Sequence, residues 1–491
     1  MKGTPNILAR YTKAGYGIAE LGMSAVEVML QIYLLVFYTS VVGLAPQWAG
    51  LALALAVGWD AITDPVMGMI TDNTHSRWGK RRPYIAVGSI FLAVAVYMLF
   101  TPPELAGQWG LFFYLLVTYI MVNTSMTVLS VPHAAMARDL TFDRHERTEL
   151  FAWRLFFRNL GFLLGTLLPG LILVVALEWG IEHAGQVSRQ EAARLLGIIV
   201  VISAFITVYA VRRIDLPVDT LDRSAETSQY TIWQWDREMV VALSEVLQNR
   251  FFVPLLIAYV IAAIGRTLNA SLALKFYELR LGFTEFQTVA YVLAPFMLFL
   301  SLGIAGWVWI SHHFGKKWPA FWGALTLGFL TVFTYPLLPY GQVWAAVFFA
   351  SFLGGLVVGA IILFDSLVAD IVDYDELKTG KQREGIYFGA WTMATKLARA
   401  LGLAATGMLL SLIGIGPDTV VSAEVTSFRI AMLFGPAVGS CFILAALVFL
   451  AMPLTDKKHR QVQRLLEAKR RRTERTPGPV SGGSAAPDSH V

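Results

Sequence analysis

Long apolar runs recur from one end of the chain to the other, and they constrain its fold more than any other feature. A transmembrane helix needs roughly 20 consecutive, mostly apolar residues to cross the hydrocarbon core of a bilayer. Of the 491 residues, 56% are hydrophobic and only 15% are charged, whereas about 25% are charged in ordinary soluble domains. We therefore predict an all-α membrane protein with about twelve transmembrane helices. Their expected positions are residues 16–39, 45–71, 84–101, 109–132, 155–177, 195–211, 252–275, 287–310, 319–337, 342–364, 386–413 and 428–452.

Basic residues gather in alternate loops between these runs. The basic loops contain Arg77, Lys80, Arg81, Arg82, Arg138, Arg144, Arg147, Arg212, Arg213, Lys316, Lys317, Lys378, Lys381 and Arg383. The loops near residues 40–47, 102–108 and 414–427 contain no Lys or Arg. Because Lys and Arg are retained on the cytoplasmic side of a membrane, we expect an even number of spans and both termini in the cytoplasm.

The composition also limits the function. The basic loops account for the net charge of +5, so no nucleic-acid partner is needed to explain it. The single cysteine, Cys441, excludes an intramolecular disulfide and a cysteine-rich metal site. The chain has no Gly-rich phosphate loop, no histidine pair at metal-binding spacing and no Gly-x-Ser-x-Gly nucleophile motif. We therefore expect neither an enzyme nor a bound cofactor.

A sequence motif recurs in the loops that follow the second and eighth apolar runs. The first copy is Arg77-Trp-Gly-Lys-Arg-Arg-Pro83, and the second is His313-Phe-Gly-Lys-Lys-Trp-Pro319. The repeat predicts two pseudo-symmetric six-helix bundles, the layout of the major facilitator fold, in which two halves rock about a central site. The expected parts are an N-terminal bundle over 1–213, a cytoplasmic middle loop over 214–250, a C-terminal bundle over 251–454 and a basic, disordered cytoplasmic tail over 455–491.

Asp60 and Asp64 lie four residues apart inside the second apolar run, so a helix places both carboxylates on one face. An isolated Asp at the centre of a membrane helix costs roughly 2.5–3.5 kcal/mol on insertion scales, so such acids face a cavity or a polar partner. Together with hydroxyls such as those of Thr63 and Thr127, they offer the oxygen ligands that a hard cation such as sodium prefers. The same acids could instead carry a proton, or form a structural ion pair with a basic residue of another helix.

Two further motifs resemble those of a known family. Trp59-Asp-Ala-Ile-Thr-Asp-Pro65 precedes the first loop motif, and Ala369-Asp-Ile-Val-Asp-Tyr-Asp375 precedes Gly380-Lys-Gln-Arg-Glu-Gly385. In this order they resemble signatures of the glycoside–pentoside–hexuronide:cation symporters, the melibiose permease-like family of the major facilitator superfamily. The resemblance implies a secondary symporter that couples inward sodium or proton movement to uptake of a sugar or glycoside by alternating access.

The resemblance also assigns a cation site. It places the cation-binding acids of the family on Asp60 and Asp64, its helix-four threonine near Thr127, and its helix-eleven lysine on Lys396. Lys396 would reach the acids across the central cavity and compete with the cation for them, which would couple the two halves. Alternatively, it is a lysine that extends to the membrane surface from near a helix end.

The solute site resembles the family less closely. Two sugar-binding carboxylates of the family fall on Ser24 and Ser130, so both are absent here. The candidate substrate-binding residues are Glu20, Ser24, Glu27, Asn123, Thr124, Arg154, Arg158, Arg266, Asn269, Trp391 and Thr395. The two glutamates would either bind solute hydroxyls or pair with the arginines of the fifth run. The arginines leave open an anionic sugar, a hexuronide or a sulfonated sugar, while an amphipathic lipid and a non-transporting sensor are further alternatives.

Charges of opposite sign occupy the expected cytoplasmic loops of the two halves. The candidate gate residues are Asp72, Arg77, Lys80, Arg81, Asp370, Asp373, Arg383 and Glu384. Salt bridges between the halves would form when the cytoplasmic mouth is shut and would stabilise the outward-open state, unless these are simply solvated loop charges. The expected partners are a small sugar-like solute, one monovalent cation and the lipid bilayer, for a monomer in a bacterial inner membrane.

Overall fold

The computed structural model describes residues 8–72, 74, 76–104, 107–141, 144–212, 244–339, 341–379, 383–415, 423–453, 461–462 and 465. Most of the predicted middle loop over 214–250 and of the predicted tail over 455–491 lies outside these residues. None of the described residues belongs to a β-strand.

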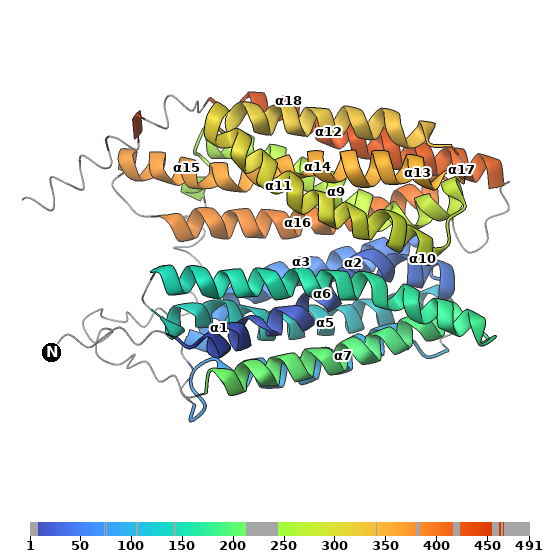
Figure 1. Cartoon of the computed structure of the whole chain (residues 1–491), viewed down its shortest axis with the longest axis horizontal. Coiled ribbons are helices and arrows are strands. Elements are labelled where there is room, and N and C mark those ends of the chain that lie inside the picture. The colour runs from blue at the N-terminus through green and yellow to red at the C-terminus, as the bar shows by residue number, and fades with distance from the viewer. Residues whose placement is uncertain are drawn as a thin grey trace, which may run out of the picture.

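The N-terminal part of the chain forms six long helical segments, coloured blue to green in Figure 1. The first segment joins two α-helices and a short π-helix, and each of the others is one α-helix. Their bounds are α1 Arg10–Gly17, α2 Ala19–Val36, η1 Phe37–Val41, α3 Pro46–Asp72, α4 Arg82–Phe100, α5 Gly107–Leu140, α6 Arg144–Glu178 and α7 Ala184–Ala210. We call these elements the N half.

The C-terminal part repeats this arrangement with more irregular helices, coloured yellow-green to red in Figure 1. Short π and 3-10 turns interrupt three of its long segments, where the backbone bends without leaving the helical path. The bounds are α9 Phe252–Leu281, α10 Glu285–Gln287, η3 Thr288–Leu293, α11 Ala294–Phe314, α12 Lys317–Leu337, α13 Val343–Ala346, η4 Val347–Leu353, α14 Gly354–Val358, η5 Gly359–Ile361, α15 Ile362–Thr379, α16 Glu384–Leu412, α17 Ala423–Met432, η6 Leu433–Ala437 and α18 Val438–Leu450. We call these elements the C half.

The apolar runs of the sequence account for the long segments. In the described part of the chain, eleven of them are long and apolar enough to cross a membrane. The twelfth is α16, which has 29 residues and carries Lys396 and Arg399 along its length. The prediction of an all-α protein with twelve long helical segments in two halves is therefore confirmed. The helix ends differ from the prediction, because α6 begins at Arg144 instead of near residue 155: polar residues extend the helix beyond its apolar run.

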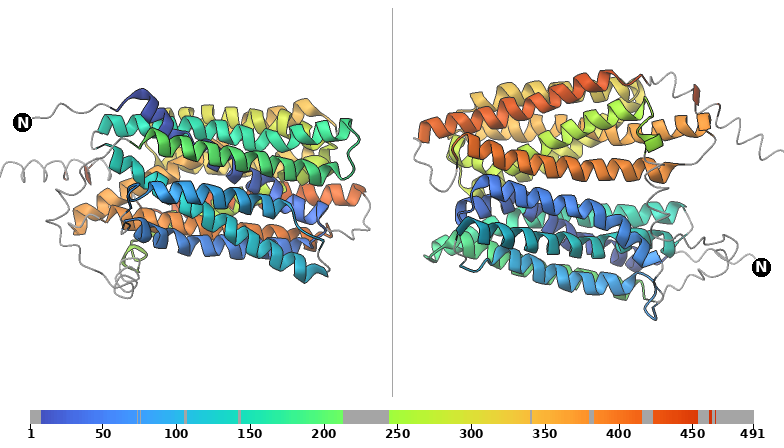
Figure 2. Two further views of the ribbon diagram at one scale, coloured as in Figure 1. Left: turned by 90° about the horizontal axis from the view of Figure 1, so that it is seen from below. Right: turned by 180° about the vertical axis from the view of Figure 1, so that it is seen from behind.

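The two halves lie side by side with their long helices running in one common direction (Figures 1 and 2). The most extensive contacts between them are made by α3 with α16, by α2 with α9, and by α6 with α10, η3 and α11. In the view from behind, α16 lies directly along α3 (Figure 2, right). This boundary between the halves is where residues far apart in sequence meet.

The end of the bundle without basic loops, which we call the opposite end, is packed tightly across the boundary. A Cβ atom on Gly407 of α16 would lie 2.2 Å from the carbonyl oxygen of Pro46 and 2.8 Å from Cα of Gly50 on α3. Only glycine permits this approach, because the neighbouring atoms belong to the backbone. At the same end, buried Arg189 of α7 forms an ion pair with Glu285 of α10. The halves are thus joined here by close packing and by charge.

At the other end, which carries the basic loops and is called the basic end, the packing of the C half is self-contained. One hydrophobic cluster includes residues of both halves, such as Leu53, Leu272 and Leu403. A second cluster runs from Val246 to Met452 and contains C-half residues alone. The shared core therefore lies toward the opposite end, and the described core of the C half near the basic end packs without the N half.

Candidate functional site

The two acids of α3 meet a threonine of α5 at the centre of the bundle. The hydroxyl oxygen of Thr127 lies 2.8 Å from Oδ1 of Asp60 and 2.8 Å from Oδ1 of Asp64. The side chain of Thr127 is buried, and those of Asp60 and Asp64 are 18% and 29% exposed. One turn of α3 thus presents two carboxylates to one hydroxyl, as the four-residue spacing predicts.

Lys396 of α16 crosses the boundary between the halves to reach the same acids. Its Nζ atom lies 2.7 Å from Oδ2 of Asp60, bonds Oδ2 of Asp64, and donates to the carbonyl oxygen of Asp60 at 3.3 Å. The lysine therefore neutralises one of the two negative charges and ties the C half to the N half.

The oxygen atoms of Thr127, Asp60 and Asp64 limit which ion the site can hold. A hydroxyl group has one proton, so Thr127 can donate to only one of its two carboxylate neighbours at a time. The other 2.8 Å contact joins two oxygen atoms that repel each other unless a proton or a cation lies between them. The direct contact set of Asp60, Asp64 and Lys396 also carries a net charge of −1 when each group is ionised. Both observations favour one monovalent cation.

Other polar residues around this set make local contacts. The Thr63 hydroxyl donates to the carbonyl oxygen of Asp60 at 3.2 Å, within its own helix. Thr124 accepts a hydrogen bond of 3.1 Å from the indole of Trp59, and a buried amide nitrogen of Asn123 has no hydrogen-bond partner among the described residues. Among those residues, no group of three or more His, Cys, Asp or Glu side chains is placed to hold a metal ion.

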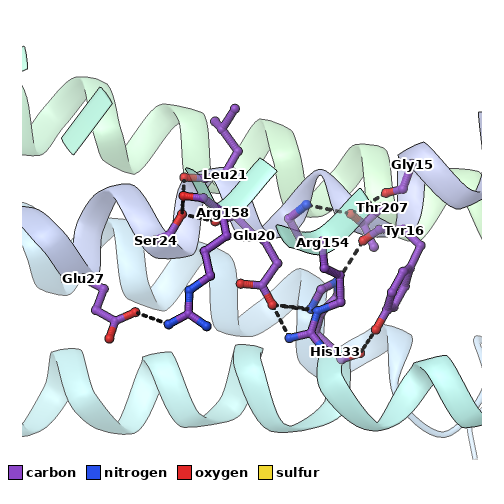
Figure 3. A network of polar contacts seen from close by, with 11 residues as sticks. Gly15, Tyr16, Glu20, Leu21, Ser24, Glu27, His133, Arg154, Arg158 and Thr207 are labelled. Atoms are coloured by element: carbon purple, nitrogen blue, oxygen red, sulfur yellow. Dashed lines mark hydrogen bonds and ion pairs between the residues drawn. The ribbon is translucent and has the colours of Figure 1, made fainter. Parts of the chain in front are cut away.

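The glutamates of α2 pair with the arginines of α6. This is one of the two alternatives that the sequence leaves open; the other was binding of solute hydroxyls. Glu20 bonds the guanidinium of Arg154, with an Nε–Oε1 distance of 2.8 Å (Figure 3). Glu27 lies 3.7 Å from Arg158, and these two side chains are 40% and 47% exposed. The hydroxyl of Ser24, between them, lies within hydrogen-bond distance of the carbonyl oxygens of Glu20 and Arg158 and can donate to either one. Glu20 is therefore satisfied within the N half, whereas Glu27 and Arg158 remain accessible.

Sequence reasoning missed His133, which completes the Glu20 cluster. Its Nδ1 atom lies 3.6 Å from Glu20, and its Nε2 atom lies 2.8 Å from the carbonyl oxygen of Tyr16 (Figure 3). A carbonyl only accepts, so Nε2 carries the proton. The ring is fully buried and stacks on Tyr16, with the ring centroids 4.7 Å apart. The available signal was an ionisable residue inside an apolar run.

Arg399 was also missed. It lies one turn beyond Lys396 on α16, borders a small cavity with Tyr119 and Leu53, and interacts electrostatically with Glu27 and Asp60. Arg399 therefore adds longer-range positive charge on the C-half side of the boundary.

A larger cavity of about 390 Å³ lies in the C half and reaches the N half at Gln31. It is lined by Arg266 and Asn269, which the sequence analysis names, and by Asp365 of α15, which it does not. Asp365 accepts a 2.7 Å hydrogen bond from the indole of Trp391. Its signal, like that of His133, was an ionisable residue within an apolar run.

Two C-half candidates are not free to bind a solute in this conformation. Trp391 is only 5% exposed and lies against Tyr259 with the ring centroids 4.0 Å apart, so it offers no open aromatic platform. The hydroxyl of Thr395 donates to the carbonyl oxygen of Trp391 within α16. Trp391 instead positions Asp365 through the hydrogen bond from its indole.

The candidate gate residues lie at the basic end, and their described ion pairs join residues of one half. Arg81 pairs with Asp139 at 2.7 Å, and Lys316 pairs with Asp370 at 2.6 Å. Arg383 pairs with Glu245 at 2.5 Å. Arg77 and Glu384 are exposed, and Lys80 and Asp373 are half-buried. The side chain of Asp72 lies outside the described set.

Comparisons with known proteins identify a family that this chain matches and relatives that are similar over most of its length. The MFS/sugar transport protein family matches residues 15–456 of the chain. The putative glycoside/cation symporter YagG of Escherichia coli (strain K12) is 26% identical over 97% of this chain and 97% of its own. The sodium-dependent lysophosphatidylcholine symporter 1-A of Danio rerio is 22% identical over 94% of this chain and 89% of its own.

A bacterial homologue of the human lysosomal transporter Spinster, solved in an inward-facing and unoccupied conformation, has the same fold. Its TM-score is 0.66 at 13% sequence identity, over 92% of this chain and all of that chain. A structural match at such low identity shows the fold alone, whereas the family match extends over nearly the whole sequence. The predicted family is confirmed. The chain belongs to the MFS/sugar transport protein family of the major facilitator superfamily.

Proposed function

We propose that the protein accumulates a sugar or glycoside by symport with one sodium ion or proton, which binds at Asp60, Asp64 and Thr127. The observation that carries this proposal is the position of Lys396, whose ammonium group from the C half lies between two carboxylates of the N half. A cation that enters the oxygen cluster competes with Lys396 for the same atoms. Cation binding therefore alters the bond between the halves, which is what coupling requires.

The conformation supports alternating access. If the basic end faces the cytoplasm, as the loop charges predict, the closed opposite end faces outward and the structure is the inward-facing state. Lys396 then occupies the acids after the cation has left for the cytoplasm. The gate residues at the basic end would exchange their partners within each half for partners across the boundary when that end closes. The function would be transport without enzymatic chemistry, in a bacterial inner membrane.

A sugar or glycoside is the solute that the family description and the name of YagG favour. A lysophospholipid is a second candidate, because one relative is named a sodium-dependent lysophosphatidylcholine symporter. An anionic sugar has less support, since Glu20 and Glu27 already face the arginines of α6.

Uptake into proteoliposomes tests the proposal. The purified protein would receive an inward sodium gradient, an inward proton gradient or neither, with radiolabelled melibiose, xylose, glucuronate and lysophosphatidylcholine as separate solutes. We expect one of the sugars to accumulate under one gradient and only to equilibrate without it. Equilibration of every sugar under all conditions would refute symport of a sugar, and accumulation of the lipid alone would establish the second candidate.

A further inference from the structure

The cavity of the C half has a polar side and an apolar side. Its polar residues include Gln31 of α2, Arg266 and Asn269 of α9, and Asp365 of α15. The helices α2 and α9 pack against each other across the boundary, so this side of the cavity meets the central region between the halves. Most of the remaining lining is apolar, with Leu300, Leu327, Leu330, Phe349, Val358 and Phe442, and Thr331, Thr334 and Tyr335 of α12 lie among these residues.

The polar side offers both kinds of hydrogen-bonding group. Asp365 uses Oδ1 to accept from Trp391, and no hydrogen bond to Oδ2 is present among the described residues. Arg266 donates one bond of 3.3 Å to the hydroxyl of Tyr259 and is otherwise exposed. Hydroxyl groups both donate and accept, so a carboxylate oxygen beside guanidinium and amide donors suits a sugar ring.

The mostly apolar side, where the hydroxyls of Thr331, Thr334 and Tyr335 are the polar groups, suits a sugar ring less well than the polar side. Hydroxyls buried against leucine and phenylalanine would lose their hydrogen bonds to water without replacement. At about 390 Å³, the cavity lies near the lower limit of roughly 300–1,000 Å³ typical of small-molecule sites. That volume fits an aryl or short alkyl group next to a ring, and it is small for a long acyl chain.

We propose that this cavity binds the apolar aglycone of a glycoside, with the sugar ring at Asp365, Arg266 and Asn269. The proposal rests on the function proposed above and narrows its solute class to aryl and alkyl glycosides. It also gives Asp365, an acid outside the cation site, a role in binding the solute.

Protection of cysteines from alkylation tests occupancy of the cavity directly. The only natural cysteine would be removed by Cys441→Ser, and Thr334→Cys or Met297→Cys would then place a thiol on either wall of the cavity. The matched control is Ser301→Cys on the exposed face of α11. The probes are the methyl, hexyl and phenyl glycosides of glucose, galactose, xylose and glucuronic acid, together with lysophosphatidylcholine.

We expect the hexyl and phenyl forms of at least one sugar to slow labelling by N-ethylmaleimide tenfold or more at a cavity position, with no change at Ser301→Cys. Asp365→Asn should raise the protecting concentration about tenfold, as expected for loss of a charged hydrogen bond. Three results would overturn the proposal. They are equal protection by methyl glycosides, protection by lysophosphatidylcholine alone, and no protection at either cysteine. If plain sugars still accumulate under a gradient without cysteine protection, the proposed symport stands and only the aglycone site falls.

Discussion

Two charged clusters lie inside the bundle, and they differ in which parts of the protein they join. Glu20, Arg154 and His133 come from three helices of the N half. Asp60 and Asp64 come from the N half, while Lys396 comes from the C half. If the halves move as rigid bodies, the first cluster keeps its geometry and the second must change. A charged cluster inside the membrane can therefore serve stability or coupling. Its role depends on whether its ion pairs lie within one half or cross the boundary between the halves.

The largest expected effect comes from removing an acid of the cluster at the boundary. A membrane potential of 100 mV supports roughly fiftyfold accumulation per charge moved. We expect Asp60→Asn and Asp64→Asn each to reduce the accumulation ratio of the solute to near one, because the cation loses a charged ligand. Uptake into proteoliposomes measures this ratio, with Glu178→Gln on the exposed end of α6 as the control. Wild-type accumulation by both variants would remove the acids from the mechanism.

Replacing Lys396 tests the other side of the same cluster. We expect Lys396→Ala to lose at least tenfold in accumulation while the protein still inserts, because two carboxylates then face each other without an ammonium group. Such a site should gain stability from a cation, so the melting temperature should rise more steeply with sodium or with acid than in the wild type. Lys396→Arg is the conservative comparison. Unchanged coupling in the alanine variant would show that the lysine is only a structural partner.

The cluster confined to the N half should respond differently. Glu20→Gln leaves the guanidinium of Arg154 largely buried without its carboxylate, which costs about 3 kcal/mol of stability. We expect a lower melting temperature, a few-fold lower transport rate and an unchanged dependence on the coupling cation. A changed cation dependence in this variant would contradict the distinction between the clusters.

The smallest effect on cation coupling is expected at the opposite end, where Arg189 and Glu285 also pair across the boundary. Arg189→Gln leaves the buried carboxylate of Glu285 without its partner, so closure of that end should weaken by about 3 kcal/mol, which changes the ratio of the two conformations by roughly a hundredfold. Labelling of a cysteine placed at Gly185 should increase, and accumulation should remain gradient-dependent. Loss of cation coupling in Arg189→Gln would mean that any ion pair across the boundary takes part in coupling.

Much of the fold follows from the sequence, because a bilayer accepts few solutions. Backbone groups in hydrocarbon must bond within their own segment, so each apolar run of sufficient length becomes a helix. The repeated loop motif indicated two similar halves, and the resemblance named the family. The predicted span near 386–413 corresponds to α16, although its two basic residues lower its apolar character.

The candidate site could be predicted only in part. The spacing of Asp60 and Asp64 shows that they share a helix face, because helical geometry is local. The resemblance named Thr127 and Lys396, and the sequence left two alternatives for Glu20. His133, Arg189, Glu285 and Asp365 were not identified, although each lies in or beside an apolar run.

The sequence by itself determined the membrane class, the helices and the faces of those helices that carry charge. Only the tertiary structure decided which charges meet: Lys396 with the acids of α3, Arg154 with Glu20, and Arg189 with Glu285. Periodicity records how a side chain is directed around its own helix axis. The identity of its partner depends on how separate helices pack, and that packing arises from contacts between residues far apart in sequence, 96 to 332 positions for these three pairs.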